Sequence, residues 1–163
     1  MAPGESAMDP HGPNLASEID IGPQGSDTTT PLPTPAGHAG LRVRVRPEYL
    51  PARSDPHQPM HVFAYHVTLD YEASVDAPRV QVVDRHWRII DASGGEDTVD
   101  GEGVVGLQPI LVPGERFEYA SYCPLRSRWG TMEGHYGVVT LDEHDRPTAR
   151  HEAAIGRFYL VSS

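Results

Sequence analysis

The three glycines Gly101, Gly103 and Gly106 are the first residues whose spacing points to chemistry. They match the G-x-G-x-x-G pattern, in which the backbone approaches a pyrophosphate and the third glycine opens a helix whose N–H groups bind it. Pro109 and Pro113 follow, and a helix interior does not accept proline, which lacks an N–H and clashes with the preceding turn. The motif therefore predicts a loop or bulge between strands, shaped by glycine. A small anion-binding nest of backbone N–H groups is the alternative.

Two arginines, Arg85 and Arg88, add cationic groups that could hold an anion. In an extended strand Asp84, His86 and Arg88 share one face, and Arg85 shares the other face with Trp87. One interpretation is a polar patch that binds an anion or a partner's carboxylate, together with the glycine motif. The interpretation we favour is a ladder of ion pairs across neighbouring strands, above a tryptophan that packs between two sheets.

The nine histidines do not form a metal-binding motif. His61 and His66 are five residues apart and would lie on opposite faces of a strand. His135 shares a face with Glu133, and His57 lies with Asp55 in a proline-rich loop, but neither pair supplies three ligands. The one cysteine, Cys123, excludes an intrachain disulfide and a zinc or iron–sulfur site built from several cysteines of this chain. There is also no Gly-x-Ser-x-Gly elbow. We therefore expect no metal, no cofactor and no catalytic residue, with the thiol serving as a small buried apolar group.

A second candidate surface combines aromatic and arginine side chains, the types that anchor protein interfaces. It consists of Tyr122, Arg126, Arg128 and Trp129. We predict that these residues contact a partner protein. The alternative is that Trp129 only covers one end of the folded domain.

Composition excludes several classes of function. The chain has 163 residues, with 13 basic residues, all arginine, against 23 acidic ones, and a formal net charge of −10. Excess carboxylate gives no sequence-independent attraction to nucleic acid or to anionic lipid. No run of about 18 apolar residues and no basic, apolar leader is present. We therefore expect a cytoplasmic protein that binds neither nucleic acid nor membranes.

Residues 1–40 differ from the rest of the chain. They hold 7 of the 16 prolines, 6 of the 16 glycines, five carboxylates, no arginine and no aromatic residue. So little apolar surface cannot offset roughly 1–2 kcal/mol of backbone entropy for each ordered residue. We predict a disordered acidic tail over 1–40 and one folded domain over 41–163. Leu15, Ile19 and Ile21 could dock in a groove, although an inert extension is the simpler interpretation.

Strand patterns begin at Leu41. Leu41, Val43 and Val45 alternate with three arginines, which predicts a strand with one buried and one solvated face. Similar patterns recur, and Pro113-Gly114 fits the centre of a type II turn. No stretch has the apolar period of a substantial helix. The expected strands cover residues 41–46, 61–71, 80–90, 115–123, 131–141 and 155–161, with a short edge piece at 98–99. This all-β pattern predicts an antiparallel two-sheet sandwich of the immunoglobulin or fibronectin III kind, with a small barrel as the alternative.

Short motifs follow one another in order over residues 41–163. They are Glu48-Tyr-Leu-Pro51, Ser54-Asp-Pro56, Val62-Phe-Ala-Tyr65, Arg85-His-Trp87, Gly101-Glu-Gly-Val-Val-Gly106 with Gln108-Pro109, Pro113-Gly-Glu115, Phe117-Glu-Tyr119, Cys123-Pro-Leu125 and Gly130-Thr-Met-Glu-Gly134. In this order and spacing they resemble the ApaG domain family. Two local departures are Tyr122, where a glycine commonly precedes Cys-Pro-Leu, and Ser127-Arg-Trp129, which enlarges the next loop.

The resemblance implies a fibronectin III-like sandwich and an association with cobalt resistance and magnesium efflux, as in bacterial members. It also implies a protein-recognition module, as in relatives of the domain in F-box proteins and in a DNA polymerase-interacting protein. A pyrophosphate site suggested for the family would map to Gly101, Gly103 and Gly106, and no catalytic residue carries over. We therefore predict a non-enzymatic ApaG-type binding domain that interacts with a protein. The alternative is a sensor of a nucleotide, polyphosphate or divalent cation that uses the loop at 101–106. Partner identity and oligomeric state do not follow from the sequence.

Overall fold

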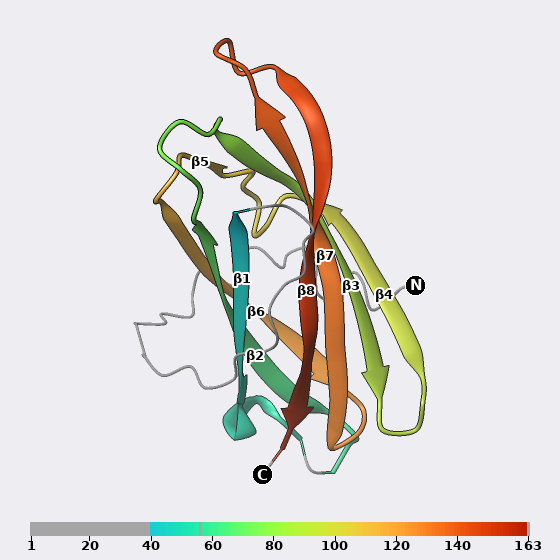
Figure 1. Cartoon of the computed structure of the whole chain (residues 1–163). Helices are drawn as coiled ribbons and strands as arrows, with labels where there is room; N and C mark the ends of the chain where they lie inside the picture. The colour runs from blue at the N-terminus through green and yellow to red at the C-terminus, as the bar shows by residue number, and fades with distance from the viewer. Residues whose placement is uncertain (1–39, 56, 163) are drawn as a thin grey trace.

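The computed structural model describes residues 40–55 and 57–162 and shows two antiparallel sheets packed face to face (Figure 1). One sheet has the order β1-β2-β6, from Leu41–Tyr49, His61–Tyr71 and Arg116–Leu125. The other has the order β4-β3-β7-β8, with β5 also paired to β3. Its strands are β3 (Val80–Asp91), β4 (Glu96–Glu102), β5 (Ile110–Leu111), β7 (Trp129–Leu141) and β8 (Pro147–Val161). A short 3-10 turn, η1, spans Pro51–Arg53. The all-β sandwich predicted from the sequence is confirmed.

Alternation in the sequence sets which side chains enter the core. In β1, Leu41, Val43 and Val45 are buried, and the arginines between them face outward. β1 pairs with β2 in the register Val43↔Leu69, so β2 presents its own apolar face to the same interior. The buried face that alternation predicts is therefore the one observed.

Three differences from the expected strands have simple causes. β8 begins at Pro147 rather than at residue 155, because its first residues are exposed and pair with β7 through the backbone without an apolar pattern. β4 extends over Glu96–Glu102 because its acidic residues pair with β3, although only Val99 is buried. β5 has two residues, too few for alternation to reveal. The predicted tail, apart from Gly40, lies outside the described residues.

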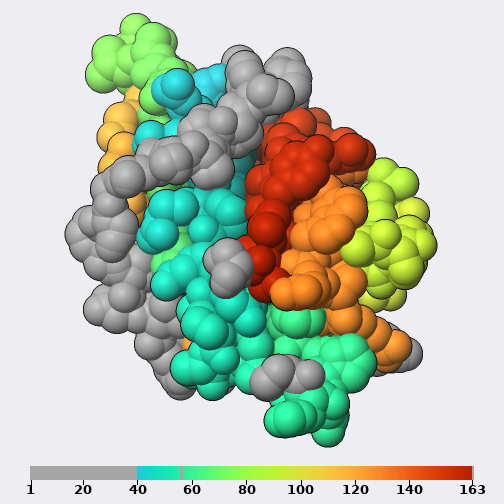
Figure 2. Space-filling view, turned by 90° about the horizontal axis from the view of Figure 1, so that it is seen from below, coloured from blue at the N-terminus to red at the C-terminus, as the bar shows by residue number. Residues whose placement is uncertain are grey.

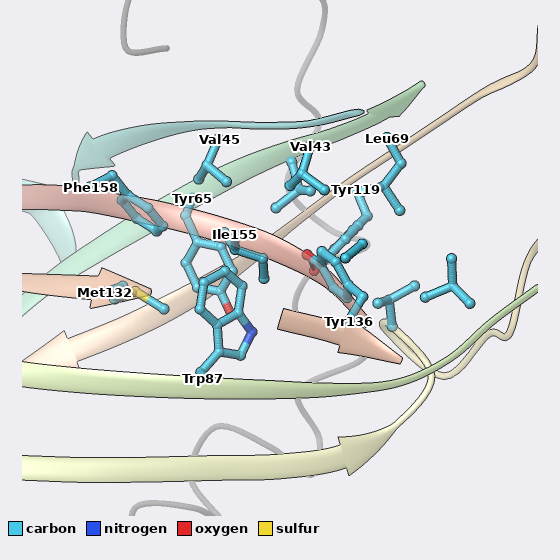
Figure 3. Packing of buried hydrophobic residues seen from close by; sticks show 14 of the residues in the cluster. Val43, Val45, Tyr65, Leu69, Trp87, Tyr119, Met132, Tyr136, Ile155 and Phe158 are labelled. Atoms are coloured by element: carbon cyan, nitrogen blue, oxygen red, sulfur yellow. Dashed lines mark hydrogen bonds between the residues drawn. The ribbon is translucent and has the colours of Figure 1, made fainter. Parts of the chain in front are cut away.

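Trp87 of β3 lies at the centre of the core, 1% exposed. Its ring contacts Tyr65, Tyr136 and Phe158 edge-on, with centroid distances of 5.2, 6.3 and 5.9 Å (Figure 3). Tyr65 belongs to β2 in the opposite sheet, so this cluster joins the two layers. The sequence-based prediction of a tryptophan packed between two sheets is confirmed.

Two buried tyrosines also connect the sheets. The hydroxyl oxygens of Tyr119 in β6 and Tyr136 in β7 lie 2.5 Å apart (Figure 3). Burial raises the pKa of both tyrosines and of the neighbouring Tyr65. These hydroxyls therefore remain protonated and act as neutral hydrogen-bonding groups inside the core.

His66, on the outer face of the three-stranded sheet, makes stability depend on pH. Its Nε2 lies 2.9 Å from Oε1 of Glu48, and its buried Nδ1 has no hydrogen-bond partner in the described part of the chain. Burial lowers the pKa of His66 below its usual 6.5, outweighing the hydrogen bond to Glu48, which raises it. The unfolded chain then binds a proton more readily than the folded one, so stability is present above pH 6.5 and falls as the pH is lowered through the folded-state pKa.

We expect urea unfolding measured from pH 7.5 to 5 to show a decreasing free energy of unfolding, and His66→Gln to remove part of that slope. Each unit by which folding lowers the pKa of His66 contributes at most about 1.4 kcal/mol to the free energy of unfolding. His144→Gln, at an exposed histidine in a turn, is the control for the loss of one imidazole outside the sheet. An identical slope in His66→Gln and wild type would contradict this assignment.

Candidate functional site

The glycine motif ends β4 and forms a tight hairpin turn. The Val104 N–H donates to the Leu107 carbonyl at 2.8 Å, and the Leu107 N–H donates back to the Val104 carbonyl at 2.9 Å. Between them, Val105 and Gly106 have φ of 44° and 82°, as in a type I′ turn. No helix follows Gly106 over the described residues up to 162, in agreement with the prediction from the two prolines.

Several backbone N–H groups of the loop already donate to carbonyls of the protein. The Gly103 N–H donates to the Val83 carbonyl at 2.7 Å, in addition to the Val104 and Leu107 N–H groups that pair with each other. A Cβ on Gly103 would overlap the Leu107 carbonyl oxygen. Close backbone approach and positive φ therefore account for glycine at 103 without a bound anion, and they reduce the number of N–H groups that could form a nest.

Arg85 fixes this loop from the inside. Its Nη1 donates to the carbonyls of Glu102 and Gly103 at 3.1 and 2.9 Å. A Cβ on Gly101 would lie 2.7 Å from the guanidinium nitrogens, so a larger residue there would displace the end of the Arg85 side chain. The structure thus brings Arg85 together with Gly101 and Gly103, with the guanidinium turned toward carbonyl oxygens.

Arg88 lies apart from the glycine loop, on the outer face of the five-stranded sheet. Its Nε donates to Glu96 at 2.6 Å and its Nη1 to Glu133 at 2.9 Å, and Glu133 also accepts from Nε of Arg157 at 2.9 Å. Hydrogen bonds from Arg88 lower the pKa of Glu96, and those from Arg157 and Arg88 lower the pKa of Glu133 against the opposing effect of burial. The charge of Arg88 is therefore already matched within the sheet.

Further ion pairs continue across this face. His86 Nδ1 lies 2.5 Å from Asp100, and Arg150 donates to both oxygens of Asp84 at 3.1 Å. The latter pair crosses β7 at Gly137, where a Cβ would overlap the Asp84 carboxylate. This arrangement is the cross-strand ladder favoured from the sequence, and we name it the charged face.

The four residues of the predicted partner surface separate into two groups. Arg126, Arg128 and Trp129 are exposed, and Trp129 is 45% exposed at the start of β7. Tyr122 is only 9% exposed, with its ring under the guanidinium of Arg53 at 4.7 Å. Tyr122 faces outward from the three-stranded sheet, but Arg53 covers it, so it adds little side-chain surface to the other three.

Two exposed residues that the sequence interpretation did not include lie beside Trp129. Strand pairing places Val161 opposite Trp129 and Tyr159 opposite Thr131 on the same face, and Tyr159 and Val161 are 56% and 57% exposed. We name Trp129, Tyr159 and Val161, with Arg126 and Arg128, the C-terminal corner. The sequence did indicate this exposed pair, because residues 158–161 form a run of four apolar residues. A strand with one buried face exposes every second residue of such a run.

The C-terminal corner lies where β8 reaches the end of the sandwich. Seen from below, β8 (red) lies at the surface between β7 (orange) and the first strands of the other sheet (cyan to teal) (Figure 2). Arg126 and Arg128 lie in the loop before Trp129 and form no ion pair with any described residue. The corner thus combines exposed apolar side chains with two unmatched cations, in a chain of net charge −10.

Other reactive groups are unsuited to nucleophilic or metal chemistry. Cys123 is fully buried, and burial, with a smaller effect from the Asp97 carboxylate, raises the pKa of its thiol to about 12. The thiol therefore stays protonated at neutral pH. Over residues 40–55 and 57–162, no group of three or more His, Cys, Asp or Glu side chains is arranged to hold a metal ion, and no helix could cross a membrane.

Comparison with known proteins places these features in a family. The family model described as the ApaG domain matches residues 51–140. Protein ApaG of Ralstonia nicotianae is 44% identical over 121 residues, which cover 74% of this chain and 91% of that protein. Protein ApaG of Bordetella pertussis is 50% identical over 99 residues, covering 61% and 73%. A crystal structure from Bordetella pertussis, described as an ApaA protein, superposes with a TM-score of 0.65 at 43% identity and covers 75% of this chain and 93% of that one. The chain belongs to the ApaG domain family.

Proposed function

We propose that this ApaG domain is a non-enzymatic protein-binding module that uses the C-terminal corner. The observation that carries the proposal is the exposure of Trp129, Tyr159 and Val161 beside Arg126 and Arg128. Aromatic residues and arginine dominate interface energetics, and an apolar patch next to unmatched charge favours a partner of opposite charge. The partner is therefore an acidic protein segment that carries at least one apolar side chain.

The rest of the fold supports this choice of surface. The charged face matches its ion pairs internally, so a partner would have to replace existing contacts there. In the corner, in contrast, Trp129, Tyr159 and Val161 lie on the paired ends of β7 and β8, and the two arginines have no ion pair with a described residue that a partner would have to replace. Three apolar side chains form a small surface, so we expect a weak, transient interaction, on the order of micromolar affinity.

The alternative sensor function at residues 101–106 has less support. The N–H groups of Gly103, Val104 and Leu107 already donate to backbone carbonyls of the protein. The Arg85 guanidinium likewise donates to carbonyls of the loop. Any link of this protein to cobalt resistance or magnesium efflux, which the family resemblance implies, would then pass through the bound partner.

A displayed library of random twelve-residue peptides tests the proposal with the full chain as bait. We expect the selected peptides to be enriched in Asp and Glu around an aromatic or aliphatic residue. Trp129→Ala, and the double variant Arg126→Ala with Arg128→Ala, should each weaken binding of a selected peptide about tenfold or more, which corresponds to 1.4 kcal/mol.

The control is a double variant at the opposite end of the sandwich, Val112→Ala with Arg146→Ala, which also removes one exposed apolar residue and one exposed arginine. Its binding should match wild type. Peptides without acidic enrichment, or peptides whose binding tolerates the corner substitutions, would show that the surface or the partner chemistry is different.

A further inference from the structure

We propose that residues 15–21 of the same chain occupy the C-terminal corner, so that the N-terminal region is an intramolecular ligand competing with outside partners. The inference rests on the proposed function of the corner. It identifies one ligand for that surface and adds a means of controlling access to it.

The chemistry of residues 15–21 complements the corner. The segment Leu-Ala-Ser-Glu-Ile-Asp-Ile contains Leu15, Ile19 and Ile21 together with Glu18 and Asp20. In an extended conformation Ile19 and Ile21 would share one side, opposite Glu18 and Asp20. The corner offers three exposed apolar side chains and two arginines without a described ion-pair partner.

Charge favours the corner over the charged face as the surface that binds residues 15–21. The first 40 residues contain five carboxylates and no arginine. The charged face offers such a segment no unpaired arginine, because Arg88, Arg150 and Arg157 already pair with carboxylates of the sheet. Of the surfaces described, the corner combines unmatched cations with large exposed apolar residues.

The length of the chain allows the contact. Between Ile21 and Gly40 there are 18 residues, numbers 22–39, and a chain of that length reaches at most about 60 Å. β1 starts at the end opposite the corner, and its nine residues extend about 30 Å. β1 also contacts β8, whose last residues form the corner (Figure 1).

Tethering makes a weak contact effective. A covalent tether whose reach matches the distance to its site gives an effective concentration in the millimolar range. A segment with only micromolar to submillimolar intrinsic affinity would therefore occupy the corner most of the time, and an outside partner would have to compete with it.

Tryptophan fluorescence of the full chain provides the test, because Trp87 is 1% exposed and Trp129 is 45% exposed. We expect the double variant Ile19→Asp with Ile21→Asp to increase acrylamide quenching of Trp129. Thr28→Asp with Thr30→Asp adds the same charge within the linker and should leave quenching as in wild type. In a Trp129→Phe background the Ile19 and Ile21 substitutions should have no effect on the remaining signal.

Equal quenching in wild type and in the Ile19 and Ile21 variant would overturn the inference. Protection of Trp129 that rises with protein concentration would also overturn it, because a second copy would then be the occupant.

A corner-binding peptide from the displayed library separates this inference from the proposed function. It should bind the Ile19 and Ile21 variant at least about threefold more tightly than wild type, since competition scales with effective concentration over Kd. If that peptide binds both forms equally through the corner, the proposed function stands and the intramolecular ligand fails. If no peptide uses the corner, the proposed function fails, whatever the quenching result.

Discussion

Trp87→Ala is expected to lower the free energy of unfolding by about 3–5 kcal/mol, the usual cost of removing a buried large aromatic side chain. Trp87 contacts aromatic rings from both sheets, so its loss leaves a cavity between the layers that strand pairing keeps open. Urea unfolding followed by far-ultraviolet circular dichroism measures the change. A loss below about 1 kcal/mol would mean that the sandwich collapses around the cavity.

Two further substitutions show what Trp87 contributes. Its Nε1 is buried and has no hydrogen-bond partner among the described residues. Trp87→Phe removes that unsatisfied donor while it keeps a ring, so we expect a much smaller loss than for alanine. Trp129→Ala, at the exposed corner, should change stability by less than about 1 kcal/mol. Together the three variants separate the tryptophan that builds the core from the one available to a partner.

Gly103→Ala is expected to cost about 2 kcal/mol or more and to open the hairpin at residues 104–107. The positive φ of 64° costs an L-residue roughly 1–2 kcal/mol. The added Cβ would also overlap the Leu107 carbonyl oxygen, so the turn that links β4 to the next segment must move. Differential scanning calorimetry should show a decrease in Tm of several degrees, as expected for a loss of this size in a domain of this length.

Gly114→Ala is the matched control. Gly114 also has a positive φ, 93°, but nothing lies within 4 Å of a Cβ placed there. It should therefore show only the conformational cost, and the difference between the two variants measures the overlap at Gly103. Equal losses would contradict the packing described for the glycine loop. Any loss of nucleotide or cation binding in Gly103→Ala is informative only after this change in stability is taken into account.

The distribution of charge is the reason why we propose a partner site at the C-terminal corner rather than at Arg88. Arg88 is held by two carboxylates from different strands. Replacing those contacts with a ligand's carboxylate gains little, because one ion pair is exchanged for another. Arg126 and Arg128 lack such partners in the described structure, so a partner's carboxylate adds an interaction.

Local sequence patterns were sufficient to predict much of the fold and the family of this protein. Alternation alone indicated which side of Leu41, Val43 and Val45 is buried, because side-chain direction along a strand depends only on the two-residue period. Pro109 and Pro113 excluded a helix after the glycine motif for an equally local reason. The family membership also followed from short motifs in order along the chain, and the comparisons confirmed it.

The tertiary structure decided which of the candidate residues are available. Arg88 is neutralised by Glu133, 45 residues away, and Tyr122 is covered by Arg53 from the η1 turn. Trp129 gains Val161 as a neighbour only through the β7–β8 register. Alternation of apolar and polar residues predicts that a side chain faces outward. Which strand lies beside it depends on pairing between segments that are far apart in the sequence. Long-range pairing is fixed by the packing of the whole core and leaves no signal in the few residues on either side.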